Sequence, residues 1–151
     1  MNGSVAGIWR YPVKSMLGES LSECDVGTGG LAGDRAFALI DLEDGRVASA
    51  KNPRKWDVLL SCRAAFVAAD LKVAEITLPD GARVRTDDPD VDAVLSKAIG
   101  REIRLASAAP DDRSFEEVWP DIDGLAPERV IAGTNIGTSD DGERISQFRT
   151  C

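Results

Sequence analysis

Three short clusters in the first third of the chain restrict its fold more than any other feature. They are Tyr11-Pro-Val-Lys-Ser15, Gly30-Leu-Ala-Gly-Asp-Arg35 and Lys51-Asn-Pro-Arg54. Each combines a cation with proline or glycine, the residues that fix or free the backbone, where a predicted strand gives way to a loop. Loops at the strand ends of one small sheet can converge. We therefore expect a phosphate or another oxyanion to be surrounded by four side chains: Lys14, Arg35, Lys51 and Arg54.

The first two clusters also offer specific anion donors. Lys14 and Ser15 place a point charge beside a hydroxyl donor after a proline-stiffened strand end, and both groups suit a phosphate. The alternative is that Lys14 is an ordinary exposed loop lysine. Asp34 and Arg35 form a local ion pair, or Arg35 presents its planar fork to an anion. These two interpretations are compatible, because a carboxylate can orient a guanidinium from behind.

Composition favours one soluble domain, or one domain with a tail. The 151 residues are 43% hydrophobic, enough for a real core. A net charge of −8 argues against non-specific binding to nucleic acid or to anionic membranes. Residues 107–151 hold ten acidic and four basic side chains, so most of that charge lies there and residues 1–106 are near neutral. With three cysteines, no secretory signal and no long apolar run, the expected location is the cytoplasm.

The sequence predicts no catalytic residue and no metal ligand. It contains no histidine, which removes the usual general base and most zinc sites. Cys24 and Cys62 fall in predicted strand or helix interiors, where a thiol is usually an inert small hydrophobe. Cys151 has no positioned base. The aspartates around Asp121 lack EF-hand spacing and suit a solvated acidic loop.

Strands account for most of the predicted regular structure. Ser4–Val13 and Leu17–Val26 read as the first two strands. Two hairpins follow, one of Ala36–Asp41 with Arg46–Ala50 about Asp44-Gly45, and one of Glu75–Leu78 with Ala82–Thr86 about Pro79-Asp80-Gly81. Val58–Ala69 is an apolar run that periodicity leaves open between helix and strand.

One good helix is predicted, over Pro89–Ile99. Asp88 can cap it, Pro89 suits its first position and Gly100 stops it. Arg101–Ala106 then returns as a strand. The expected fold is therefore α+β and mostly β, with one domain over residues 1–106. Residues 107–151 read as an acidic, poorly patterned tail or as the start of a connection.

The ordered clusters, with the strand and turn between them, resemble the N-terminal β-barrel domain of MOSC proteins. That domain occurs in the amidoxime-reducing-component and molybdenum-cofactor-sulfurase C-terminal families. The resemblance is dense over Ile8–Arg54 and thins through Arg104. It implies a small barrel-like sheet and contacts to molybdopterin from the lysine and serine of the first motif and the arginine of the second, here Lys14, Ser15 and Arg35. Lys51 and Arg54 match more loosely and are about as well explained as solvated surface charge.

In the resembled families a MOSC domain follows this region and carries the cysteine that ligates molybdenum. The chain stops at Cys151, so we expect either a truncated protein or a free-standing module whose MOSC domain is supplied in trans. The resemblance implies a module that lends cationic loops to the pterin-phosphate pocket, with the cofactor held only when a MOSC domain is present. The full-length relative would be an oxidoreductase of N-hydroxylated compounds, with a redox partner, or would handle the sulfurated cofactor. The alternative is a non-catalytic domain for small-anion binding or protein contact.

Overall fold

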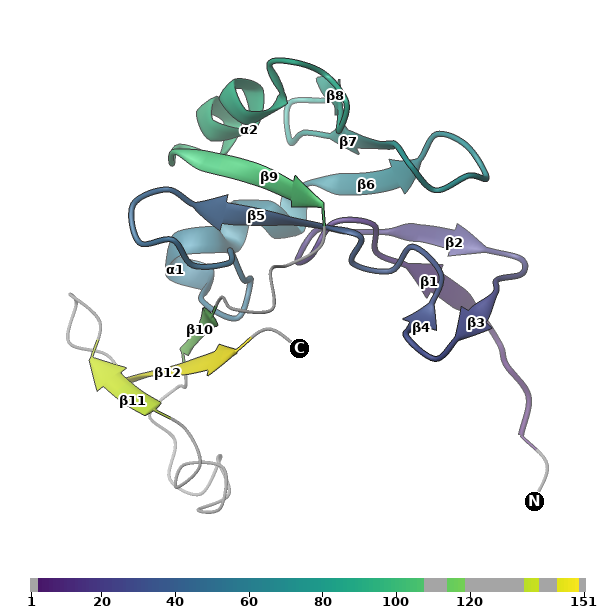
Figure 1. The fold of residues 1–151 in the computed structure, drawn as a ribbon, viewed down its shortest axis with the longest axis horizontal. Coiled ribbons are helices and arrows are strands. Elements are labelled where there is room, and N and C mark those ends of the chain that lie inside the picture. Colours follow the sequence, from purple (N-terminus) through teal and green to yellow (C-terminus); the bar gives the residue numbers. More distant parts are fainter. Residues whose placement is uncertain (1–2, 108–113, 119–134, 139–143, 150–151) are drawn as a thin grey trace.

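Strands dominate the computed structural model, which describes residues 3–107, 114–118, 135–138 and 144–149 (Figure 1). The strands are β1 (Ile8–Arg10), β2 (Glu19–Leu21), β3 (Val26–Gly27), β4 (Gly30–Leu31), β5 (Phe37–Asp41), β6 (Arg63–Phe66), β7 (Ala74–Thr77), β8 (Arg83–Arg85), β9 (Ile103–Ser107), β10 (Ser114–Val118), β11 (Asn135–Thr138) and β12 (Arg144–Arg149). The helices are α1 (Pro53–Trp56), the 3₁₀ helix η1 (Asp57–Ser61) and α2 (Val91–Ile99). This confirms the predicted mostly-β α+β class.

The strands form small antiparallel sheets. β1 pairs with β2, β3 with β4 and β5 with β9, while β6-β7-β8 and β10-β12-β11 are three-stranded. Single bridges connect some of them, including the parallel bridges Val13↔Phe37 and Leu17↔Arg63. Within the described ranges the sheets are not closed into a barrel.

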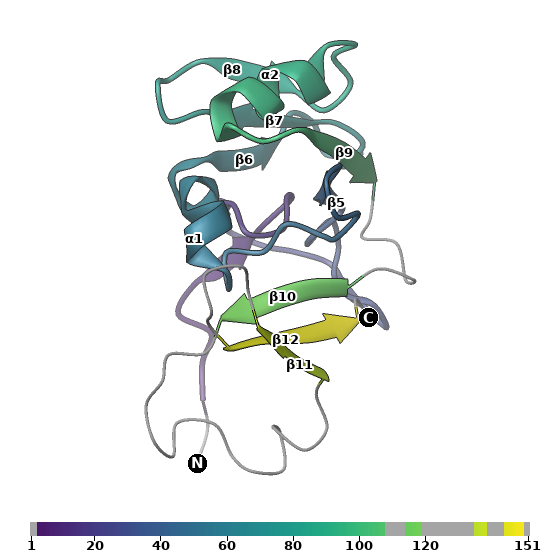
Figure 2. The ribbon, with the colours of Figure 1, turned by 90° about the vertical axis from the view of Figure 1, so that its left-hand side faces the viewer.

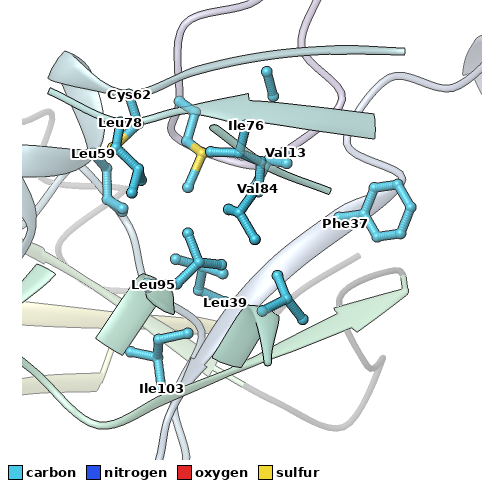
Figure 3. Packing of buried hydrophobic residues seen from close by; sticks show 14 of the residues in the cluster. Val13, Phe37, Leu39, Leu59, Cys62, Ile76, Leu78, Val84, Leu95 and Ile103 are labelled. Atoms are coloured by element: carbon cyan, nitrogen blue, oxygen red, sulfur yellow. The ribbon is translucent and has the colours of Figure 1, made fainter. Parts of the chain in front are cut away.

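One main hydrophobic core holds β5, β7, β8, η1, α2 and β9 together (Figure 3). On β7 the buried residues alternate with half-buried ones, and on α2 Val91 and Leu95 lie one turn apart on the inner face. Every residue of β5 is buried. Val13, from the first predicted motif, also lies in this core with no exposed surface. The core therefore fixes the backbone on which Lys14 is carried.

The first two strands are shorter than predicted. Of the predicted strand Ser4–Val13, only Ile8–Arg10 forms a strand. Beyond Arg10 the chain moves away from β2, and its backbone forms hydrogen bonds with the segment before β5 instead. Leu17–Val26 is divided into β2 and β3, since β3 turns back on β4 in a small hairpin of its own.

The two predicted hairpins have different outcomes. The second is confirmed as β7 and β8. In the first, the turn forms, with the Gly45 N–H donating to the Asp41 carbonyl at 2.9 Å. The arms stay bonded through the Ala48 N–H, which donates to the Leu39 carbonyl at 2.8 Å, but they form a single bridge, Ile40↔Val47, and not a strand pair. The second arm does not extend past Ala48, because the Ala50 N–H donates to Ser15 Oγ at 3.0 Å and the Asn52 N–H donates to the Ser49 carbonyl at 2.9 Å.

The structure also shows what the apolar run Val58–Ala69 and the predicted helix form. Val58–Ala69 is neither one helix nor one strand, since η1 ends at Ser61 and β6 then pairs with β7. The helix exists as α2 but begins two residues later than predicted. The Asp88 carboxylate accepts the Arg85 N–H at 2.7 Å, closing the turn after β8 rather than capping the helix. Gly100 ends α2 as predicted, at a φ of 77° that favours glycine.

The described part of residues 107–151 forms the sheet β10-β12-β11, which lies on the side of β5 and α1 away from α2 (Figure 2). Both ends of β10 form backbone hydrogen bonds with residues 47–51. The Val47 N–H donates to the Ser114 carbonyl, and the Val118 N–H donates to the Lys51 carbonyl. The division of the chain at residue 106 stays a prediction. Over the residues that the structure covers, no helix is long and apolar enough to cross a membrane.

The core predicts a sharp contrast between two leucines. Leu95 is 0% exposed in α2, whereas Leu60 is 52% exposed in η1. We expect Leu95→Ala to lower the free energy of unfolding by about 2–5 kcal/mol, because it removes buried methyl groups and leaves a cavity. Leu60→Ala should change it by less than about 0.5 kcal/mol. Urea denaturation of both variants measures this, and similar losses would contradict the described core.

Candidate functional site

Backbone pairing brings the first two cation clusters together. The Arg35 N–H donates to the Tyr11 carbonyl at 2.7 Å, and the Phe37 N–H donates to the Pro12 carbonyl at 2.9 Å. In return, the Lys14 N–H donates to the Phe37 carbonyl at 2.9 Å. The two segments therefore run parallel, side by side. Lys14 and Arg35, 21 positions apart in the chain, are carried on neighbouring backbone.

The turn before Arg35 is built for this pairing. Gly33 has a φ of 79°, and a Cβ there would lie 2.8 Å from the Phe66 ring, so only glycine fits without a shift. Asp34 Oδ1 accepts the Tyr11 N–H at 2.9 Å, and its Oδ2 lies 3.8 Å from Arg35 Nη1. Asp34 thus fastens the turn and stands beside the guanidinium, as the two compatible interpretations anticipated. The Arg35 side chain remains 68% exposed.

Ser15 connects the first cluster to the third. Its Oγ accepts the Ala50 N–H at 3.0 Å, which holds the segment before Lys51 against the Lys14-Ser15 turn. Ser15 and Arg35 both have positive φ, 68° and 51°. Such values are uncommon for residues other than glycine and cost on the order of 1–3 kcal/mol each. The contacts described above hold both residues in these conformations.

Lys14 is half-buried at the centre of the group. Its Nζ lies 4.5 Å from the centre of the Phe115 ring, and Lys51 Nζ lies 5.5 Å from the same ring. Burial first, and then the charges of Arg35 and Lys51, lower the pKa of the Lys14 ammonium from its ordinary value of 10.5. Among the described residues Lys14 has no carboxylate partner. An anion beside it would relieve the repulsion from both neighbouring cations.

The third cluster is divided by the fold. Lys51 joins the group and pairs with Glu117 of β10, at 3.1 Å between Nζ and Oε2. Arg54 lies exposed in α1, and its charge is not among those that lower the pKa of Lys14. The structure thus assembles Lys14, Ser15, Arg35 and Lys51, while anion binding by any of the predicted residues stays a prediction.

Two residues of this site were missed by sequence reasoning, Phe115 and Glu117. Both belong to β10, which was read as part of a poorly patterned tail. Their place depends on long-range pairing of β10 with residues 47–51, for which Ser114–Val118 carries no local signal. Phe115 is also partly buried against a small cluster of Ala38, Ile40 and Val47.

The two cysteines that the structure describes, Cys24 and Cys62, are not among the residues of this site. Cys62 is fully buried in the core, and burial raises the pKa of its thiol, as suits an inert hydrophobe. Cys24 is half-buried in the loop between β2 and β3, so its predicted place inside a strand was wrong, because the predicted strand is broken there. Cys151 and Asp121 lie outside the described residues. In the described ranges no three acidic or cysteine side chains come together as a metal site.

Comparison with known proteins identifies one family. The family model described as the MOSC N-terminal beta barrel domain matches residues 2–92, a span that contains all five predicted site residues but not Phe115 or Glu117. No other family matches. No curated protein and no solved structure matches the chain.

The lowered pKa of Lys14 predicts a pH-dependent contribution to stability. Between the folded-state pKa and 10.5 the unfolded chain binds more protons at Lys14 than the folded chain, so this contribution rises with pH. Wild type should therefore gain unfolding free energy relative to Lys14→Met as the pH rises from neutral toward 10.5. Urea denaturation of both proteins across this range measures the gain. Lys97→Met, at an exposed position of α2, is the control. A constant difference between wild type and Lys14→Met would contradict the account.

Proposed function

The chain belongs to the MOSC N-terminal beta barrel domain family, and on this premise we propose that it forms one wall of a molybdenum-cofactor site. In this proposal Lys14, Ser15 and Arg35 hold the pterin phosphate. The observation that carries it is the convergence of Lys14, Arg35 and Lys51, in which half-buried Lys14 has no carboxylate partner among the described residues. Half-burial of a cation near like charges is unfavourable in the chain alone, and a bound anion would offset that cost.

The side chains fit the anionic end of molybdopterin. Lys14 supplies a point charge, and Arg35 supplies an exposed planar fork that can bind two phosphate oxygens at once. The Ser15 hydroxyl accepts the Ala50 N–H and keeps its own proton to donate to a phosphate oxygen. Lys51 lies nearby, while Arg54 stands apart as a weaker candidate from the same cluster.

The residues of this chain bind and orient, and the bound cofactor supplies the redox-active metal. The other wall, with the molybdenum ligand, comes in this proposal from a MOSC domain in cis or in trans. The assembled protein is then an oxidoreductase of N-hydroxylated compounds served by a redox partner, or a protein that handles the sulfurated cofactor. We place it in the cytoplasm, on the cysteine pattern of the sequence.

A second candidate is small-anion binding or protein contact without a cofactor. Exposed aromatic side chains favour the protein-contact version, because Trp9 in β1 is 57% exposed and Tyr11, just after that strand, is 41% exposed. Cofactor content separates the two candidates. A protein that joins this chain to a MOSC domain retains molybdopterin through purification under the first, and retains none under the second.

Within that joined protein, we expect Arg35→Ala to lower cofactor content more than Arg54→Ala does. A charge-assisted contact contributes ~1.5–3 kcal/mol, and exposure of the guanidinium reduces it to about 1 kcal/mol, roughly fivefold in affinity. Molybdenum and pterin analysis of the purified proteins measures the effect. Equal occupancy in wild type and Arg35→Ala would remove Arg35 from the site. Tight binding of molybdopterin by the 151-residue chain alone would contradict the two-wall arrangement.

A further inference from the structure

An acidic strand from outside the family match lies against the cation site. Residues Phe115 and Glu117 of β10 are two positions apart, so they share one face of the strand. Phe115 lies beneath the ammonium groups of Lys14 and Lys51, and Glu117 pairs with Lys51 at 3.1 Å. This face of β10 thus provides both an aromatic surface and a carboxylate at the place where the proposed anion would bind.

The strand is anchored through its opposite face. Glu116, only 7% exposed, pairs with Arg46 at 2.7 Å and with Lys55 at 3.4 Å, and accepts a hydrogen bond from the Asn52 amide. Backbone bonds at Ser114 and Val118 add to this anchor. The backbone of β10 is therefore fixed beside Lys51. In the Glu117–Lys51 pair the lysine side chain is 55% exposed and the glutamate side chain 19%, so the pair can open by movement of Lys51 without moving the strand.

The three cations differ in how far they are already neutralised. Lys51 has a carboxylate at 3.1 Å, Arg35 has Asp34 at 3.8 Å, and Lys14 has none among the described residues. Lys14 and Arg35 together can balance the charge of a singly charged anion, so such an anion leaves the ion pair between Lys51 and Glu117 in place. An oxyanion with two or more charges gains from Lys51 as well, provided that Glu117 gives it up.

We propose that Glu117 is a built-in competitor for Lys51, which a bound oxyanion of two or more charges must displace. This inference rests on the proposed function, since it concerns the same anion site. It makes Glu117 a specificity-determining residue: it weakens binding of multiply charged oxyanions such as phosphate esters or diphosphates, which need Lys51, more than binding of small monovalent ions, which leave the Lys51 pair in place. Phe115 keeps the Lys14 and Lys51 ammonium groups together above one surface.

The test is a titration of the ¹⁵N-labelled 151-residue chain with inorganic pyrophosphate at fixed ionic strength. The amide shifts of Lys14, Ser15 and Arg35 report binding. Glu117→Gln keeps the shape of the side chain and removes its charge, so it should tighten pyrophosphate binding by about two- to fivefold, the range expected for one exposed ion pair. In a Lys51→Met background the same substitution should give no gain, because there is no pair to release.

Glu75→Gln is the matched control. It makes the same change in net charge by removing the carboxylate that pairs with Arg83 on the β6-β7-β8 sheet, and it should leave the affinity unchanged. Thermal unfolding of each variant verifies that the fold is kept. Saturable binding at Lys14 with no gain from Glu117→Gln, or an equal gain from Glu75→Gln, overturns the inference and leaves the proposed function standing. If neither wild type nor Glu117→Gln shows saturable shifts at Lys14, the anion site itself is wrong and the inference falls with it.

Discussion

The candidate site depends on one short piece of parallel pairing between residues 11–14 and residues 35–37. Three backbone hydrogen bonds of 2.7–2.9 Å join these segments. Val13 and Phe37, bridged across the pair, are buried in the main core, so the pairing is held by apolar packing as well. Without it, the YPVKS and GDR motifs would be unrelated loops, and Lys14 and Arg35 would not be carried on neighbouring backbone.

The arrangement that brings these side chains together also lowers the stability of the chain when no anion is bound. Ser15 and Arg35 are held at positive φ, and Lys14 is half-buried near two other cations. Each feature is unfavourable in the chain alone. The burial of Val13, the hydrogen bonds of Asp34 and Ser15 and the anchoring of β10 through Glu116 offset these costs. Concentration of unfavourable features at one place is typical of a binding site, where the ligand supplies the missing interactions.

Local signals in the sequence predicted the elements that depend on local chemistry. The turn at Pro79-Asp80-Gly81 and the stop at Gly100 predicted the second hairpin and the end of α2. The spacing of the first two clusters, with the family resemblance, predicted that Lys14 and Arg35 lie near each other, whereas Arg54, expected to join them, lies exposed in α1. Elements governed by long-range pairing were not predictable in this way. Val47 bonds to β10 while its neighbours stay on β5, Leu17–Val26 divides between two partners, and Glu117 reaches Lys51 across 66 positions.

The central claim is that the parallel segments present Lys14 and Arg35 to one oxyanion. A crystal structure of the chain grown with tungstate, a phosphate-like dianion with strong anomalous scattering, tests it most directly. The account predicts an anomalous peak for a tungstate bound between the two side chains. Its oxygens should lie about 2.7–3.2 Å from Lys14 Nζ and from a nitrogen of the Arg35 guanidinium. The claim would be contradicted if tungstate bound only elsewhere on the chain, in contact with neither Lys14 nor Arg35.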